Sequence, residues 1–354
     1  MTRWYSRNRS RLAHALRMAV SSLVAFGFAE ALGLPQGFWA VITALIVTQS
    51  NVGGSLKAAM DRFAGSLLGA VYGSAIAFAI PHADGVMRAL ALVLAVAPLS
   101  FAAAVSSSFR VAPITAIIVL LSTTGAALGP LGFAMDRVIE VTLGCVVGLL
   151  VSVLVVPTRA SRTVVGTAGE VVRLLADQLE AMADPGDPEQ AGMRALAVQT
   201  RQSLGRLETL VGEAAHERRS RLTDMPDPEP LLRTLLRLRN DVVMLRRAIG
   251  EPSHEALCTP PAHAWMAVAE TSAALLRHVA DALSAGQAPR PDDAIARAVG
   301  NYRAAVDGML RSPHTGQPPT DALWRLFGAG FTLEQFRRNF EDLVERSAEF
   351  ATRR

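Results

Sequence analysis

The chain has 354 residues, of which 51% are hydrophobic and 19% charged, and its formal net charge is +4. Its two cysteines, Cys145 and Cys258, provide too few thiols for a disulfide framework or a cysteine-rich metal site. The single lysine, Lys57, follows Leu56 and not glycine, which excludes a Walker A phosphate loop, and the HExxH and Gly-x-Ser-x-Gly motifs are absent. We therefore expect no enzymatic activity, no cofactor and no metal.

Nearly uncharged stretches fill the first 157 residues. A helix needs about 20 apolar residues to cross a bilayer core of roughly 30 Å. We predict a basic cytoplasmic N-terminus at 1–13 and a transmembrane domain at 14–157, a bundle of helices in the lipid bilayer. The six predicted spans are 14–33, 36–51, 63–80, 86–105, 111–128 and 138–156. A signal peptide at 1–31 is the competing interpretation, but the second span follows it immediately.

Basic residues set the predicted orientation. Four arginines precede the first span, Lys57 and Arg62 lie between the second and third, and Arg110 lies between the fourth and fifth. The alternate loops carry fewer basic residues. Because positive charge stays cytoplasmic, we expect both termini on the cytoplasmic side of the membrane.

An internal repeat links the two halves of the membrane region. Met60-Asp61-Arg62 recurs as Met135-Asp136-Arg137, and Ala40 with Ile42-Thr43-Ala44 matches Ala112 with Ile114-Thr115-Ala116. Three spans are an odd number, so the second copy would run through the membrane upside down. This predicts a 3+3 inverted repeat, the architecture in which transporters place a substrate site near the midplane. Chance agreement between similar apolar helices is the alternative.

Two glycine pairs belong to the same repeat. Gly69-x-x-x-Gly73 and Gly144-x-x-x-Gly148 suit the close approach of two helices. The approach is either within one subunit or across a dimer.

Residues 158–354 are predicted to form a cytoplasmic helical domain. Apolar residues recur at helical spacing, and Pro- or Gly-rich segments divide the region into about six helices, which we expect to form a bundle. Expected helix starts are Asp187, Asp227, Asp292 and Thr320. Arginines and acidic residues are balanced locally, so nucleic acid is not an expected partner.

Charged residues close to the bilayer are the first candidates for function, since burying them is costly. A cationic vestibule would attract small organic anions. The alternatives are snorkelling to the interface and topology signalling. The candidate anion-path residues are Lys57, Arg62, Arg110, Arg137 and Arg17.

Five further residues complete the candidate site. A desolvated carboxylate at Glu30 or Glu140 would be suited to carry a proton. Phe38 and Trp39 are candidates for stacking on an aromatic substrate, with an aromatic belt as the alternative. Gln49 is a candidate polar group along the path.

The stretch Gly37-Phe38-Trp39-Ala40, continued by 43–49 and 52–57, resembles the fusaric acid resistance family, also called the aromatic acid exporter family. The segment 331–343, Phe-Thr-Leu-Glu-Gln-Phe-Arg-Arg-Asn-Phe-Glu-Asp-Leu, is similar to the closing helix of that family. The family commonly has Tyr where Phe38 stands, which puts a hydroxyl contact there in doubt.

The resemblance implies a bacterial inner-membrane exporter of aromatic or other organic acids, driven by the proton gradient. Larger relatives carry two such halves in one chain, which implies a homodimer here. Some relatives work with a periplasmic adaptor protein. Two alternatives stay open: a passive organic-anion channel, because plant malate channels share this layout, and a membrane-anchored sensory or interaction module without transport.

Overall fold

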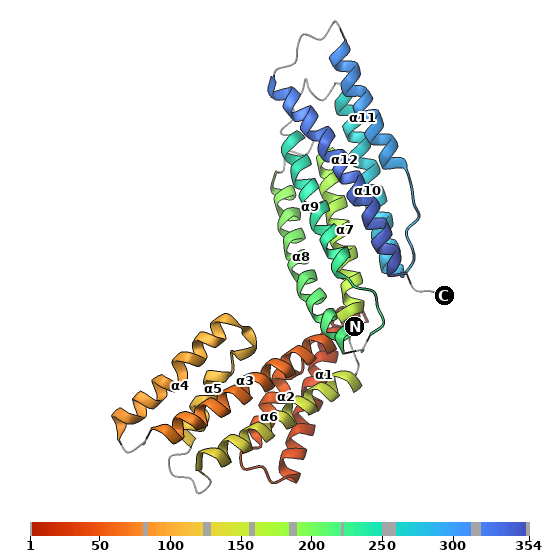
Figure 1. Cartoon of the computed structure of the whole chain (residues 1–354). Coiled ribbons are helices and arrows are strands. Elements are labelled where there is room, and N and C mark those ends of the chain that lie inside the picture. Colours follow the sequence, from red (N-terminus) through yellow and green to blue (C-terminus); the bar gives the residue numbers. More distant parts are fainter. Residues whose placement is uncertain are drawn as a thin grey trace. The chain divides into compact units, whose positions relative to one another are not determined.

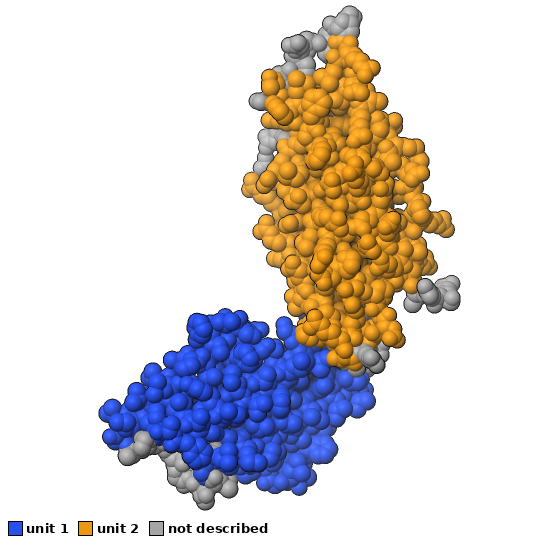
Figure 2. Space-filling view, viewed as in Figure 1, with its two compact units in different colours: residues 1–160 blue, residues 161–354 orange. Residues whose placement is uncertain are grey.

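The computed structural model describes residues 2–80, 84–122, 129–155, 160–183, 190–220, 223–249, 260–312 and 320–351. Cys258 and the expected helix start at Asp187 lie outside these residues. The chain divides into two compact units, residues 1–160 and 161–354, coloured separately in Figure 2. The described residues form α-helices, one short 3-10 helix and no strand, which confirms the all-α prediction.

Unit 1 contains the apolar helices (Figure 1). They are α1 (Thr2–Ala31), α2 (Phe38–Val47), α3 (Val52–Ala79), α4 (Gly85–Val105), η1 (Ser107–Phe109), α5 (Ala112–Ser122) and α6 (Gly129–Leu154). Four of the described segments are long and apolar enough to cross a bilayer: 11–31 of α1, α3, α4 and 131–154 of α6. The chain is therefore a multi-pass membrane protein.

The helix α2 is shorter than the span predicted for it. It has 10 residues, which is only about 15 Å of helix against a core of roughly 30 Å. The helix α5 is described for 11 residues, up to Ser122. The prediction of a continuous span at 36–51 is wrong, because Thr48 turns to an extended conformation. The second part of the predicted span 111–128 lies outside the described residues.

The connection between α2 and α3 is irregular but hydrogen-bonded. Asn51 caps α3, its side chain accepting the Gly54 N–H at 2.7 Å. Arg17 Nη2 donates to the Ser50 carbonyl at 2.7 Å, and Thr48 Oγ1 donates to Ser21 Oγ at 3.0 Å. Lipid cannot satisfy free backbone groups, so these buried polar side chains allow a helix break inside an apolar unit.

The two glycine pairs bring helices of the same chain into close contact. A Cβ atom added at Gly144 would lie 2.5 Å from the Ala40 carbonyl oxygen of α2. Gly148 lies against Ala44 and Val47 of α2 in the same way. In the other half, Gly69 and Gly73 of α3 lie against α5 at Ala112, Thr115 and Ala116. The glycines therefore serve packing within the subunit.

Substituting one of these glycines tests this packing. Gly144→Ala should destabilise the protein by about 1–3 kcal/mol, because the obstructing atom belongs to the backbone of α2 and the helices must separate. Gly27→Ala is the matched control, since no atom lies within 4 Å of its added Cβ. Thermal unfolding in detergent measures both variants, and equal transition temperatures would contradict the packing role.

Unit 2 consists of polar amphipathic helices (Figure 1). They are α7 (Ala160–Ala183), α8 (Gln190–Arg219), α9 (Glu229–Ile249), α10 (Pro260–Ala285), α11 (Ala294–Arg311) and α12 (Thr320–Glu349). The expected starts at 227, 292 and 320 are confirmed. Asp227 and Asp292 accept the backbone N–H groups of Glu229 and Ala294 at 3.1 and 2.7 Å, and α12 begins at Thr320.

A buried polar contact joins α9 to α12. Asn339 Nδ2 donates to Asp241 Oδ2 at 2.6 Å, and both side chains are at least 95% buried. Burial raises the pKa of the Asp241 carboxyl, and the hydrogen bond from Asn339 lowers it in part. The amide therefore compensates a carboxylate that the apolar surroundings disfavour.

Removing this donor should produce a pH-dependent loss of stability. Asn339→Leu should cost about 1–3 kcal/mol near neutral pH, because a buried carboxylate loses its partner. A carboxyl with a raised pKa in the folded state stabilises the fold below that pKa and loses this contribution as pH rises through it. The cost should thus shrink on acidification.

Hydrogen exchange in α9 and α12, compared with the wild type at the same pH, measures this loss. Arg303→Gln is the control, since it breaks an exposed pair with Glu334 and should cost less than about 1 kcal/mol. A penalty for Asn339→Leu that does not change with pH would show that the Asp241 charge is not involved.

Candidate functional site

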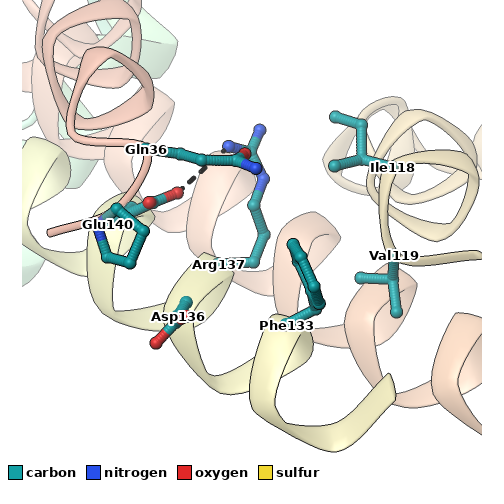
Figure 3. Close-up of a pocket in the computed structure, with 8 residues that line it drawn as sticks. Gln36, Ile118, Val119, Phe133, Asp136, Arg137 and Glu140 are labelled. Carbon is teal, nitrogen blue, oxygen red and sulfur yellow. Dashed lines mark hydrogen bonds and ion pairs between the residues drawn. The ribbon is translucent and has the colours of Figure 1, made fainter. Parts of the chain in front are cut away.

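Two oppositely charged residues lie one turn apart on α6, within the apolar unit. Arg137 and Glu140 are 3% and 1% exposed, and Arg137 Nη1 lies 3.5 Å from Glu140 Oε2 (Figure 3). This is a long contact for a charge-assisted hydrogen bond, which is usually about 2.7–2.9 Å. The Arg137 Nε and Glu140 Oε1 atoms are buried without a hydrogen bond of ordinary geometry in the described structure.

The first turn of α2 covers the other side of Arg137. The guanidinium carbon lies 3.7 Å from the ring centroid of Trp39, a cation–π contact. Trp39 Nε1 in turn donates to Gln36 Oε1 at 3.2 Å. The side chain of Phe38 is 55% exposed, and its ring centroid lies 5.1 Å from that of Trp39. The structure therefore places Trp39 in the site and leaves Phe38 at its edge.

A cavity of about 140 Å³ opens beside this pair. Its walls come from the turn before α2, from α5 and from α6, and Ile118 and Val119 lie across the cavity from Glu140 (Figure 3). The lining residues are Pro35, Gln36, Ile118, Val119, Phe133, Asp136, Arg137 and Glu140. The cavity therefore has an apolar wall and a charged wall, and the charged wall holds one guanidinium group and two carboxylates.

A second arginine is buried nearby on α3 without a counter-ion. Arg62 is 7% exposed and makes no hydrogen bond or ion pair with any described residue. Its charge acts on Arg137 and on Cys145 of α6. Asp61, its neighbour in sequence, instead accepts the Ser108 hydroxyl at 2.7 Å. Arg62 and Arg137 thus place two buried guanidinium groups between α3 and α6, with Glu140 as the carboxylate paired to one of them.

The other sequence candidates lie elsewhere. Lys57, Arg110 and Glu30 are exposed, and Gln49, also exposed, donates to the Ile46 carbonyl at 2.7 Å. Arg17 is buried, but it supports the break after α2 through Ser50. Glu30 is exposed, whereas Glu140 is buried. No group of three or more His, Cys, Asp or Glu side chains able to hold a metal occurs among the described residues.

Sequence reasoning named Arg137, Glu140 and Trp39 separately but missed that they form one cluster. The spacing of Arg137 and Glu140 was the available signal, because residues at i and i+3 face each other on a helix. No sequence signal placed Trp39 or Gln36 against them, since that contact depends on how α2 packs on α6.

The stacking contact can be measured by a double-mutant cycle. Trp39→Leu should weaken the fold more than Trp39→Phe, because phenylalanine keeps an aromatic face over the guanidinium. The part specific to Arg137 should be about 0.5–2 kcal/mol. Repeating both substitutions in an Arg137→Gln background isolates that part by thermal unfolding. An unchanged difference in that background would show that Trp39 contributes only apolar packing.

A multi-pass membrane protein with buried cations beside a small cavity is the class that this fold and site define. The model of the fusaric acid resistance protein family matches residues 11–350. The chain belongs to that family, which confirms the resemblance noted in its sequence and the expectation that it is not an enzyme.

Curated relatives match over shorter segments. The uncharacterized transporter YdhK of Salmonella typhimurium is 36% identical over 69 residues, which are 20% of this chain and 10% of that protein. The inner membrane protein YccS of Escherichia coli is 26% identical over 149 residues, 42% of this chain and 20% of YccS. The protein ORF2 of Neisseria gonorrhoeae is 32% identical over 71 residues, 20% of this chain and 17% of that protein.

Proposed function

We propose that the protein is an inner-membrane exporter of small organic anions, with aromatic carboxylic acids as the substrate class. The observation that carries the proposal is the pair of buried guanidinium groups, Arg62 and Arg137, with one paired carboxylate. An uncompensated charge inside an apolar unit is expensive and marks ion pathways in membrane proteins. A substrate carboxylate would supply the missing negative charge.

The cavity supports an aromatic acid within that class. An apolar cavity of roughly 150 Å³ holds a benzene-sized molecule, and the cavity beside Arg137 measures about 140 Å³. Phe133, Ile118 and Val119 offer apolar contacts for a single ring, while Arg137 offers donors for its carboxylate. Family membership and the name of the relative YdhK, an uncharacterized transporter, agree with passage across the membrane.

The two helix triplets α1–α3 and α4–α6 are proposed to be inverted copies. In support, the matched glycine pairs pack on matched partners: Gly69 and Gly73 on α5, and Gly144 and Gly148 on α2. The helices α2 and α5 also hold corresponding places in the two triplets. In this arrangement the third helix of each triplet packs on the middle helix of the other triplet. Arg62 and Arg137 would then hold equivalent positions near the midplane, where such transporters bind substrate.

The cellular arrangement is proposed on sequence and family grounds. Both termini lie in the cytoplasm, in line with the positive charge around the predicted inner loops. The inner-membrane location agrees with the name of the relative YccS, an inner membrane protein. The protein acts as a homodimer, and Trp324, Phe327 and Phe331 form an exposed aromatic stripe on α12 suited to such contact. A periplasmic adaptor is a further proposed partner. Export draws on the proton gradient, and Glu140 is the buried group able to take up a proton.

Substitution of the unpaired arginine tests the proposal. Arg62→Gln should lower benzoate transport roughly tenfold or more, because it removes a buried charge-assisted contact to the carboxylate. Lys57→Gln is the matched control on the same helix, since its side chain is exposed, and should change the rate less than about twofold. Benzoate uptake into inverted membrane vesicles measures both, with and without a protonophore.

The outcomes separate the alternatives. Transport that collapses with the protonophore supports driven export, whereas an anion current that simply follows the membrane potential identifies a channel. A sensory module predicts that Arg62→Gln leaves tolerance to aromatic acids unchanged, while deletion of residues 165–354 abolishes it. Equal transport by Arg62→Gln and the wild type would remove the main support for an anion site at α3.

A further inference from the structure

The contact between Arg137 and Glu140 is incomplete for a buried ion pair. A single 3.5 Å approach joins them, and the remaining Nε and Oε1 atoms have no hydrogen bond of ordinary geometry among described residues. Arginine–carboxylate pairs frequently form two parallel hydrogen bonds, and charge-assisted bonds are usually about 2.7–2.9 Å long. Both side chains also line the cavity. Arg137 therefore retains donors that a second carboxylate could use better than Glu140 does.

The repeat supplies an internal comparison. The offset that relates Arg62 to Arg137 relates Gly65 to Glu140. A Cβ atom added at Gly65 would lie 3.0 Å from the Ser108 carbonyl oxygen and 3.5 Å from Val111 Cβ. Close packing against η1 and the start of α5 thus disfavours a side chain at position 65, the place that corresponds to Glu140. The acidic residue at 140 is a feature of one copy and is not required by the helix arrangement.

We propose that Glu140 is an internal latch, which occupies Arg137 while the cavity is empty and is replaced there by the carboxylate of the ligand. The proposal rests on the function proposed above and adds how the site is regulated. Glu140 and the ligand are alternative partners of one guanidinium group. Arg62, without a tethered acid, is the arginine that stays open to anions in both states.

Replacement of Glu140 by the ligand carboxylate at Arg137 changes the surroundings of the Glu140 carboxyl and therefore its protonation. Glu140 shares the cavity lining with Arg137 and Asp136 of its own helix and with Gln36 of the turn before α2. The α5 wall, Ile118 and Val119, carries no titratable group. When the ligand takes Arg137, Glu140 is left in a small cavity beside a second anion and beside Asp136. Like charges and burial both favour the neutral carboxyl, so ligand binding is linked to uptake of a proton by Glu140.

Titration calorimetry of the full-length protein in detergent tests this linkage. The probes are benzoate and benzenesulfonate, both of which stay ionised between about pH 6 and pH 8. Heats measured in two buffers of different ionisation enthalpy give the protons taken up per ligand. We expect uptake approaching one proton in the wild type, with affinity weakening by up to about tenfold for each unit that the pH rises.

Removing the latch should remove the linkage. Glu140→Gln should take up no proton, bind with an affinity independent of pH, and bind roughly tenfold or more tightly than the wild type near pH 8. Glu30→Gln is the matched control, since Glu30 is exposed, and should behave as the wild type. Arg62→Gln should weaken binding and keep the proton uptake, because the latch is intact.

Three results would overturn the proposal. The first is benzoate binding to the wild type without proton uptake, a measurement that needs no variant. The second is proton uptake that persists in Glu140→Gln. The third, useful if that variant does not fold, is proton uptake that persists in Arg137→Gln, which has no guanidinium to compete for. Absence of any binding by the wild type and Glu140→Gln would instead refute the proposed anion site itself.

Discussion

Guanidinium charge between apolar helices is the constraint on which the rest of unit 1 depends. Arg62 on α3 and Arg137 on α6 lie on the two helices that form the centre of the unit. Each charge must be compensated inside a low-dielectric space, and the two guanidinium groups differ in the side chains that lie beside them. Arg137 has a carboxylate and an aromatic face. Arg62 has neither among the described residues, and we propose that the substrate anion supplies its counter-charge.

Close helix packing makes this arrangement possible. The glycines at 69, 73, 144 and 148 let α3 and α6 each approach the middle helix of the other triplet. Because α2 is short, polar backbone between α2 and α3 lies within the apolar unit, and the buried side chains of Arg17 and Asn51 bond to it. The same middle helices place Trp39, Gln36 and Ile118 around one cavity. Backbone irregularity and the candidate site thus have a common origin.

Several parts of this protein were predictable from the sequence, and one part of the fold was not. Long apolar runs correctly indicated α1, α3, α4 and α6, and turn residues correctly indicated the starts of α9 and α11. The second span was predicted too long, because hydropathy does not distinguish a helix from an apolar extended segment. The capping of α3 by Asn51 and the hydrogen bond from Arg17 to Ser50 stabilise the irregular segment that follows α2.

The sequence by itself determined the protein class, an all-α, multi-pass membrane protein of the fusaric acid resistance family. It could do so because hydropathy and family motifs are both properties of short, contiguous segments. It also named the buried charges as candidates. The tertiary structure alone decided which of them meet. The i,i+3 spacing of Arg137 and Glu140 is local. The stacking of Trp39 on Arg137, a contact about 100 positions apart in sequence, and the isolation of Arg62 depend on helix rotation and packing. No local sequence pattern encodes these contacts. Whether a buried charge has a partner on another helix depends on which side chains of that helix face it.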